Sequence, residues 1–457
     1  MMMMEGLFDS TDTICAISTA PGVGGIAVAR VSGAKALECV DKLWRGKPLA
    51  GVASHTAHLG TIIDPADGSV LDQGVATVFR GPNSFTGEDV VELSIHGSRW
   101  IQRQLISLLV AAGCRLANPG EFTRRAFLAG KLDLAEAEAV ADLIASSSRA
   151  SHRIAISQMR GGISRKLDAL RAELLDLASL LELELDFSEE EVEFASRQRL
   201  IELADEVHGE LQRLGATFAR GAAIKDGIPV AIVGRTNAGK SSLLNALLGD
   251  DRAIVSDIHG TTRDTIEETI ELGDYLFRFI DTAGLRATDD SIERIGIERS
   301  RRAMQQARII IAVIDATEPV DEELLAELAA AEAYVIYAIN KTDCAPAPSL
   351  AVEQGSVVAI SALNGQGIDE LTDKMTALIA EEGSDDDVIL TNARHAEAIA
   401  AATRSISATA DALRSGIPAD LVAQDLRETL HHLSAITGTI STPEILATIF
   451  SRFCIGK

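Results

Sequence analysis

The sequence predicts a multidomain fold in which an α/β domain of the P-loop type, residues 228–380, is inserted into an all-helical domain. Residues 131–227 and 381–457 form the two halves of this discontinuous helical bundle, and residues 1–130 form an N-terminal α+β domain. Three observations carry this prediction. A chain of 457 residues is long for one hydrophobic core. Hydrophobic periodicity changes from strand-like to helical near residue 131. Gly234–Ser241 reads G-R-T-N-A-G-K-S, where apolar strands alternate with helices.

The N-terminal domain is predicted from short β-branched runs separated by Gly/Pro turns. We expect four strands and a helix over Thr13–Ser18, Ile26–Val31, Gly74–Phe79, Val90–Ile95 and Trp100–Ala112. Pro21–Gly25 resembles a dinucleotide-binding glycine motif, but a strand follows it in place of a helix, so we expect a tight turn there.

The helical stretches are predicted from apolar residues at three- and four-residue spacing, as in Leu167–Ala178. Helical periodicity resumes after the acidic linker Ser384–Asp387, and Thr442 followed by Pro443 is typical of a helix start. Neither stretch alone offers a large core, so one helical domain interrupted by the α/β domain is the economical interpretation.

Five apolar runs in the α/β domain each lead into a loop, as expected of a doubly wound parallel sheet. The expected strands are Pro229–Val233, Leu276–Ile280, Arg308–Ile314, Val335–Ile339 and Val357–Ile360.

Composition is that of an ordinary globular protein, with 47% hydrophobic and 24% charged residues. No apolar run reaches the ~18 residues that a membrane span needs. The N-terminus lacks the basic and apolar regions of a signal peptide, so we expect a cytoplasmic protein. The five cysteines include no C-x-x-C pair, and we expect reduced thiols.

Charge is distributed unevenly along the chain. Residues 1–130 carry 11 Lys/Arg and 12 Asp/Glu, a net charge of −1, so the remainder carries −24 of the total of −25. Because phosphate binding needs clustered cations, tight RNA binding by this chain alone is not expected, and a basic partner protein is the more natural RNA reader.

The G-x-x-x-x-G-K-S motif follows an expected strand and opens an expected helix, the context of a phosphate-binding loop. Gly234 and Gly239 let backbone N–H groups surround the β-phosphate, Lys240 reaches the β- and γ-oxygens, and Ser241 binds Mg²⁺. Thr262, in the Gly260–Asp264 segment, is placed to be a second Mg²⁺ ligand.

Guanine specificity is predicted from Asn340–Asp343, which reads N-K-T-D. The Asp343 carboxylate accepts from guanine N1–H and N2–H₂, which adenine lacks, so GTP is preferred. Ser361–Ala362 presents a backbone N–H to guanine O6, whereas Asp281 holds the metal through water and the Gly284 amide contacts the γ-phosphate.

Hydrolysis needs a group other than glutamine to orient the attacking water, because Leu285 follows Gly284. Glu293 could do so, although a solvated glutamate at a helix start is an equally good interpretation. Asn237 offers a neutral oxygen near the phosphates for a monovalent cation, closed over by Ser256–Thr261, but a hydrogen bond within the loop would explain it equally well.

Further motifs give the chain a family resemblance. Together with the nucleotide motifs, Pro21–Gly25, Phe85–Asp89, Lys131–Glu136 and the terminal Phe453–Lys457 (F-C-I-G-K) resemble the tRNA-modifying GTPase family MnmE, also called TrmE, over essentially the whole chain. Thr236 replaces the usual proline of the family, and Leu363 stands where a basic residue is common.

The resemblance implies a K⁺- and Mg²⁺-dependent GTPase that forms a homodimer through its N-terminal domains. It implies a heterotetramer with the FAD-dependent MnmG (GidA) that adds an aminomethyl or carboxymethylaminomethyl group at C5 of the wobble uridine of tRNA. The one-carbon source is 5-formyl- or 5,10-methylene-tetrahydrofolate, and the N-terminal domain binds it.

Site residues carry over from the family by position. K⁺ ligands are Asn237, Ser256, Ile258 and Thr261, and Mg²⁺ ligands are Ser241 and Thr262. Folate contacts are Arg30, Glu92, Lys131 and Lys457, with Glu293 orienting water and Cys454 as the catalytic thiol. The full nucleotide-binding set is Asn237, Ala238, Gly239, Lys240, Ser241, Ser242, Ser256, Asp257, Ile258, His259, Gly260, Thr261, Thr262, Asp281, Thr282, Ala283, Gly284, Asn340, Lys341, Asp343, Ser361, Ala362 and Leu363.

A ribosome-assembly GTPase is the main alternative, since such switches share the phosphate loop and K⁺ dependence. Those proteins carry a basic RNA-binding module, whereas the appended domains here are near-neutral and acidic. A membrane-remodelling GTPase is disfavoured because no basic amphipathic segment is present. For Cys454, a buried and inert thiol is the ordinary expectation for so apolar a chain end.

Overall fold

The computed structural model describes residues 12–186, 197–249, 254–255, 267–280, 293–350, 352, 354–381, 388–440, 442–451 and 453–456. The chain divides into two units, Met1–Ala141 with His431–Lys457, and Asp142–Leu430. None of the helices in these described ranges is long and apolar enough to cross a membrane.

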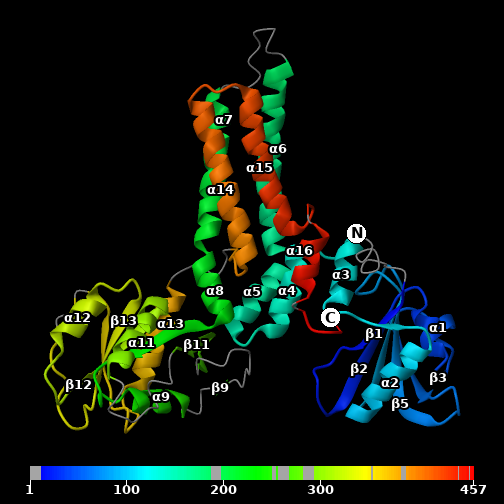
Figure 1. Ribbon diagram of the computed structural model, residues 1–457, viewed down its shortest axis with the longest axis horizontal. Helices are drawn as coiled ribbons and strands as arrows, with labels where there is room; N and C mark the ends of the chain where they lie inside the picture. The colour runs from blue at the N-terminus through cyan, green and yellow to red at the C-terminus, as the bar shows by residue number, and fades with distance from the viewer. Residues whose placement is uncertain are drawn as a thin grey trace. The chain divides into compact units, whose positions relative to one another are not determined.

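The first unit is built on a seven-stranded sheet of order β3-β4-β5-β6-β2-β1-β7 (Figure 1). Its strands are β1 (Ile14–Ile17), β2 (Gly24–Ser32), β3 (Trp44–Arg45), β4 (Thr56–Ile63), β5 (Val70–Phe79), β6 (Val90–Gly97) and β7 (Arg115–Leu116). Its helices are α1 (Ala36–Asp41), the 3₁₀ turn η2 (Leu49–Gly51), α2 (Arg99–Ala111), α3 (Glu121–Leu128) and α16 (Pro443–Phe450). All strands pair antiparallel except β7, which runs parallel to β1.

One face of this sheet packs against α1 and α2, because alternate residues of β2 and β6, such as Ala29 and Leu93, are buried there. The four strands and the helix expected from sequence are confirmed, with β2 extended back to Gly24. Strand β4 was not expected from the sequence, because its alternation contains Gly60 and the exposed Leu59.

The second unit contains a seven-stranded sheet of order β14-β13-β12-β8-β11-β10-β9. Its strands are β8 (Ile228–Val233), β9 (Ile254–Val255), β10 (Glu268–Leu272), β11 (Tyr275–Phe279), β12 (Ile309–Asp315), β13 (Tyr334–Asn340) and β14 (Ser356–Ala359). The associated helices are α9 (Lys240–Leu248), α11 (Glu293–Gln306), α12 (Glu322–Ala329) and α13 (Ile368–Ala380).

The five strands expected in this domain are confirmed, and they pair in parallel. The missed β10 pairs antiparallel with β11 through the two-residue turn Gly273–Asp274, where Gly273 has φ 59°. Because β10 carries two glutamates in five residues, its hydrophobic signal was weak.

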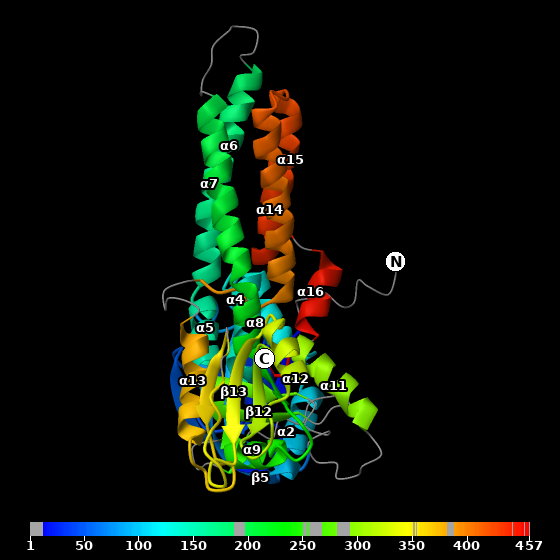
Figure 2. The same cartoon turned by 90° about the vertical axis from the view of Figure 1, so that its left-hand side faces the viewer.

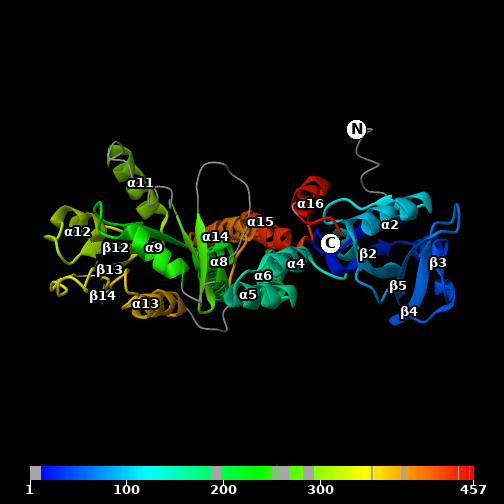
Figure 3. The ribbon, with the colours of Figure 1, turned by 90° about the horizontal axis from the view of Figure 1, so that it is seen from below.

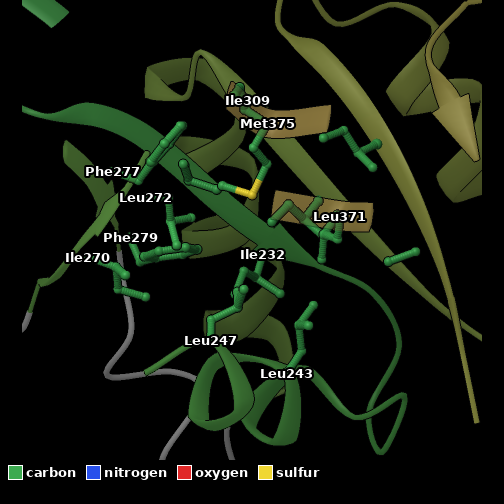
Figure 4. Close-up of a cluster of buried hydrophobic side chains, with 14 of the residues drawn as sticks. Ile232, Leu243, Leu247, Ile270, Leu272, Phe277, Phe279, Ile309, Leu371 and Met375 are labelled. Carbon is green, nitrogen blue, oxygen red and sulfur yellow. The ribbon is translucent and has the colours of Figure 1, made fainter. Parts of the chain in front are cut away.

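Both faces of this sheet are covered, which explains its nearly continuous apolar strands. One core lies under α9 and α13, where Leu243, Phe277 and Met375 meet (Figure 4). A second core joins the other face to α11 and α12 through Ala303 and Leu328. Figure 3 shows α11 and α13 on opposite sides of the sheet.

Long helices make up the rest of the second unit. These are α5 (Arg149–Met159), α6 (Gly162–Asp186), α7 (Arg197–Ala216), α8 (Phe218–Asp226) and α14 (Ala393–Arg414); α4 (Leu134–Ala145) and α15 (Ala419–Thr437) continue from one unit into the other. Figure 2 shows α6, α7 and α14 side by side.

Helices that precede the α/β sheet in the chain pack on α14, which follows it. The Arg197 guanidinium donates to the carbonyls of Leu413 and Ile417, both at 2.7 Å. Where the chain returns to the helices, the Leu390 N–H donates to the Thr217 hydroxyl at 3.0 Å. Gly221 is required here because a Cβ would lie 2.1 Å from the Leu390 carbonyl. The α16 start is confirmed as expected, with the Thr442 hydroxyl accepting from the Ile445 N–H and Pro443 in the first turn.

Candidate functional site

The carboxyl ends of β8, β12, β13 and β14 meet at one edge of the second sheet, because these strands are parallel. Ligands of open α/β sheets bind at this edge. The sequence motifs follow these strand ends, at residues 234–241, 340–343 and 361–363. Three predicted segments, far apart in the chain, are therefore brought to one place.

Glycines allow the loop of residues 234–239 to pass close to neighbouring backbone and side chains. Gly234 has φ 146°, and a Cβ there would lie 2.3 Å from the Val313 carbonyl. Gly239 has φ 98° and abuts Asn340, whose Nδ2 would be 2.1 Å from a Cβ. Asn237 is exposed at the loop tip with φ 64°, a left-handed conformation that asparagine tolerates well.

The Lys240 side chain folds back onto the loop of residues 234–239. Its Nζ donates to the carbonyls of Gly234 and Arg235, each at 2.8 Å, and burial lowers the pKa of its amine. An ammonium held by neutral carbonyls in a partly desolvated loop gains a stronger, oppositely charged partner when phosphate oxygens enter. Ser241 and Ser242 lie exposed in the first turn of α9, where helical N–H groups and the helix dipole favour an anion.

Asn340 joins the three loops. It is 3% exposed, its Nδ2 donates to the Ala238 carbonyl at 2.9 Å, and its Oδ1 accepts from the Ala362 N–H at 3.0 Å. A single buried amide thus sets the distance between the phosphate loop and the two loops expected to hold the base. Its role in the structure is to hold these loops together.

Asp315, at the end of β12, is a functional candidate that sequence reasoning missed. Its carboxylate pairs with the Lys341 ammonium at 2.5 Å and accepts from the Thr317 N–H and hydroxyl. Burial alone would raise the pKa of Asp315, but the Lys341 ammonium and the Thr317 donors lower it overall. This pair holds Lys341, which has φ 65°, at the end of β12. An acidic residue ending a fully buried strand was the available signal.

Asp343 is prepared to accept hydrogen bonds. The Ser361 hydroxyl, and to a smaller degree the Cys344 thiol at 3.3 Å, holds the pKa of its carboxyl below the usual value. The neighbouring Thr342 is anchored by its N–H and hydroxyl to the Ile360 carbonyl at 3.2 and 2.9 Å. Leu363, by contrast, is 83% exposed beside this loop.

Several predicted nucleotide and metal residues lie outside the described residues. These are Ser256, Asp257, Ile258, His259, Gly260, Thr261, Thr262, Asp281, Thr282, Ala283 and Gly284. Glu293 is the first residue of α11, but its side chain is also outside the described part.

A second cluster lies in the first unit. Arg30 of β2 and Glu92 of β6 are register partners, and the Arg30 Nε donates to the Glu92 carboxylate at 2.9 Å. The Arg30 guanidinium lies over the Phe85 and Phe122 rings, 5.2 and 5.6 Å from their centroids. The sequence pairs Arg30 with neither phenylalanine; only the fold brings them together.

A buried ionic network braces the segments that carry these rings. Arg125 of α3 is 5% exposed and donates to Glu88, Asp12 and Glu121. Glu88 is held in turn by the Ser32 hydroxyl at 2.6 Å. Burial alone would raise the pKa of Glu121, but donors from Arg115, the Asn118 N–H and Arg125 lower it overall. The network therefore fixes α3, which bears Phe122, against the loop that bears Phe85.

Lys131 lies beside the same loop, since a Cβ on Gly87 would lie 3.7 Å from its Cε. The chain end is also held on this unit. The Gly456 carbonyl accepts from the Ser18 hydroxyl at 3.0 Å, and Phe450 and Phe453 are buried against Leu134 and Ala137. Lys457 lies outside the described residues.

The ordinary expectation that the Cys454 thiol is buried is wrong. Helix α16 ends at Phe450, the side chain of Phe453 takes the buried position, and Cys454 is exposed. Its carbonyl accepts from the Gly120 N–H at 3.4 Å, so the thiol projects from an anchored backbone. All five cysteines are free, as expected.

Comparison with known proteins tests the resemblance. A family model for the MnmE helical domain matches residues 134–454, and one for the N-terminus of the GTP-binding protein TrmE matches residues 13–131. A Parabacteroides distasonis protein named tRNA modification GTPase MnmE is 50% identical over 97% of this chain and 100% of its own length. A Porphyromonas gingivalis protein of the same name is 48% identical over 98% of both. The solved G domain of the T. maritima FeoB iron transporter is 28% identical, covers 34% of this chain and 98% of that one, and has a TM-score of 0.25.

The two family models together span nearly the whole described chain, and the relatives match it from end to end. The resemblance drawn from the sequence motifs is thereby confirmed, and the chain belongs to the MnmE family of tRNA modification GTPases.

Proposed function

We propose that this chain binds and hydrolyses GTP as the switch of a tRNA-modifying enzyme. The observation that carries this proposal is the convergence of Lys240, Asn340 and Asp343 at one sheet edge, joined by the Asn340 amide. Family membership supplies the tRNA-modifying role. The 457-residue chain spans the full length of relatives named for it.

Nucleotide binding follows from the loop geometry. The triphosphate replaces the Gly234 and Arg235 carbonyls as the acceptor for Lys240, while N–H groups at the start of α9 surround the β-phosphate. Asp343 accepts from guanine N1–H and N2–H₂, and its lowered pKa keeps it ionised for that purpose. An ATP-bound site would leave this carboxylate unmatched, which disfavours adenine.

Metal ions complete the site in this proposal. Ser241, exposed in the first turn of α9, and Thr262 would hold Mg²⁺, which neutralises charge that develops on the β- and γ-phosphate oxygens. Asn237, with Ser256, Ile258 and Thr261, would hold K⁺. Its exposed position at the loop tip supports this, because within the described part of the chain its amide makes no hydrogen bond that would occupy it. Glu293 orients the water in place of a residue at position 285.

The first unit binds tetrahydrofolate as the 5-formyl or 5,10-methylene derivative in this proposal. Arg30 and Glu92 form a donor–acceptor pair beside two aromatic rings, and Lys131 lies beside the same loop. Flat heteroaromatic rings pack well against such surroundings. The anchored tail brings the exposed Cys454 thiol to this unit, and Lys457 follows Gly456 directly in the sequence.

A homodimer through the first unit is supported by exposed apolar side chains on the sheet face opposite α1 and α2. Leu59, Val75, Ser94 and Val28 are successive register partners across β4, β5, β6 and β2, on the face opposite α1 and α2. Leu59 is 69% exposed, and Ile26 on the same face is 71% exposed. Exposed large apolar side chains on one sheet face are typical of interaction sites.

The proposed complex pairs this homodimer with FAD-dependent MnmG (GidA) as a cytoplasmic heterotetramer that installs an aminomethyl or carboxymethylaminomethyl group on C5 of the wobble uridine. Nucleoside analysis of bulk tRNA from a deletion strain tests it. Loss of that modification, restored by the intact gene, is expected. Intact wobble-uridine modification would refute the proposal and favour a ribosome-assembly GTPase. Hydrolysis equally fast in Na⁺ and K⁺ would separately refute the cation site.

A further inference from the structure

Lys341 has an unusual backbone conformation directly after β13. Its φ is 65°, in the left-handed region that side chains other than those of asparagine and aspartate rarely adopt. Within the described part of the chain, the other non-glycine residues with a positive φ are His55 and Asn237. Such a conformation persists only where surrounding contacts hold it, and it is concentrated at functional sites. The contacts that hold Lys341 therefore point to a function.

Asp315, the last residue of β12, holds the Lys341 side chain. Its Oδ2 atom lies 2.5 Å from Lys341 Nζ, and the carboxylate is 8% exposed. Because Asp315 and Asn340 are register partners in adjacent parallel strands, Asp315 lies beside the point where the chain leaves β13. The Lys341 carbonyl accepts from the Cys344 N–H at 2.9 Å, so the backbone that follows is held as well.

The Asp315 carboxylate is fully engaged by protein donors. Its Oδ1 atom accepts from the Thr317 N–H at 2.9 Å and from the Thr317 hydroxyl at 2.7 Å, while Oδ2 accepts from Lys341. Burial alone would raise the pKa of Asp315, but these donors lower it overall, so the group is ionised at neutral pH. Since both oxygens are occupied, the contact with Lys341 explains Asp315 better than a role as an open metal ligand.

The segment held by this pair leads to Asp343. The intervening Thr342 is fixed by its N–H and hydroxyl to the Ile360 carbonyl, at 3.2 and 2.9 Å. Asn340, on the other side, is 3% exposed and hydrogen-bonded to two loops. A rotation of the Lys341 backbone would therefore move Thr342 and Asp343 relative to the Asn340 amide.

We propose that Asp315 is a positioning residue that determines specificity for guanine, because it holds Lys341 in the conformation that directs the Asp343 carboxylate toward the base. This rests on the proposed function, in which Asp343 accepts from guanine N1–H and N2–H₂. Asp315 does not touch the nucleotide and acts through Lys341. A glycine at position 341 would adopt the same conformation without a partner, whereas lysine needs one.

The test measures binding of GTP and of inosine triphosphate (ITP) to the full-length protein, by displacement of a fluorescent GDP analogue. Inosine lacks the 2-amino group, so the ratio of the two affinities reports the hydrogen bond between Asp343 and N2–H₂. Asp315→Asn should weaken GTP binding about 10-fold and lower the GTP-to-ITP ratio about threefold, because a charge-assisted contact is lost. For GTP hydrolysis, KM should rise while kcat stays within about twofold, since the contact acts on the base and not on the phosphates.

Two further variants identify Lys341 as the link. Lys341→Met removes the same ion pair from its more exposed side and should lower the ratio in the same way. In a Lys341→Gly background, Asp315→Asn should change the ratio by less than about twofold, because glycine adopts the left-handed conformation unaided.

Asp321→Asn is the matched control, because it makes the same chemical change in the segment that follows β12. Asp321 caps α12, and asparagine caps a helix about as well as aspartate. The GTP affinity and the GTP-to-ITP ratio of this variant should stay within about twofold of those of the unmodified protein.

An unchanged ratio in Asp315→Asn and Lys341→Met would overturn the proposal, even if both nucleotides bind more weakly, because Asp315 would then have only a structural role. A loss confined to kcat, or an undiminished effect of Asp315→Asn in the Lys341→Gly background, would also overturn it. If thermal unfolding shows that Asp315→Asn does not fold, Lys341→Met decides. Failure of the unmodified protein to bind GTP would instead refute the proposed function itself.

Discussion

Replacing Asn340 by alanine should weaken GTP binding more than the same replacement at any exposed asparagine of the α/β domain. The change removes two buried hydrogen bonds, to the Ala238 carbonyl at 2.9 Å and from the Ala362 N–H at 3.0 Å. Each is worth about 0.5 to 1.5 kcal/mol, so the loss is about 1 to 3 kcal/mol. Water cannot easily replace them, since Asn340 and Ala238 are 3% and 2% exposed.

If the whole loss falls on the nucleotide complex, GTP binds about 5- to 150-fold more weakly, because each 1.4 kcal/mol changes the dissociation constant tenfold. Titration with a fluorescent GTP analogue measures it, and thermal unfolding measures the part that reaches the free protein. Asn364→Ala is the control, because Asn364 is exposed in the neighbouring loop. Binding within twofold of the unmodified protein, with an unchanged unfolding midpoint, would refute the role given to Asn340.

Three further predictions follow from particular contacts. Gly239→Ala should abolish nucleotide binding, because Gly239 has φ 98° and a Cβ there would lie 2.1 Å from Asn340 Nδ2. Equilibrium dialysis with GTP tests this prediction. Near-normal binding would contradict it and show that the loop relaxes. Cys454→Ser should abolish tRNA modification but spare GTP hydrolysis, and unchanged modification in nucleoside analysis would rule out an essential thiol. Because the folded-state pKa of Glu121 and of Asp12 is lowered, the stability they contribute is present above their unfolded values, about 4, and is lost as the pH falls through their folded values. The thermal unfolding midpoint should fall less steeply with decreasing pH in Glu121→Gln than in the unmodified protein. An identical dependence on pH would contradict the stabilising role of the ionic network around Arg125.

The nucleotide motifs could be predicted from the sequence because the residues of each motif lie within a few positions of one another. Gly234, Gly239, Lys240 and Ser241 act within one strand–loop–helix unit, so spacing alone identifies them. Asp315 was missed because its partner Lys341 follows a different strand, and only their parallel pairing, Asp315 beside Asn340, brings them together.

The N-terminal cluster shows the same limit more strongly. Nothing in the sequence connects Arg30 with Phe85 and Phe122, or Arg125 with Asp12 and Glu88. Their contacts depend on sheet register and on the placement of α3, both of which are set by long-range packing. Without the family resemblance, Arg30, Glu92 and Lys131 would be interpreted as ordinary surface or ion-pair residues.

The chain's sequence by itself determined most of the element types, the phosphate-binding loop, the preference for guanine and the family. These follow from periodicity and from motifs whose residues act over a few positions. The tertiary structure alone decided which loops share the Asn340 amide, that Phe453 and not Cys454 is buried, and that Arg30 lies over the rings of Phe85 and Phe122. The physical reason is that burial and hydrogen bonding depend on neighbours distant in sequence, whereas propensity and motif spacing do not.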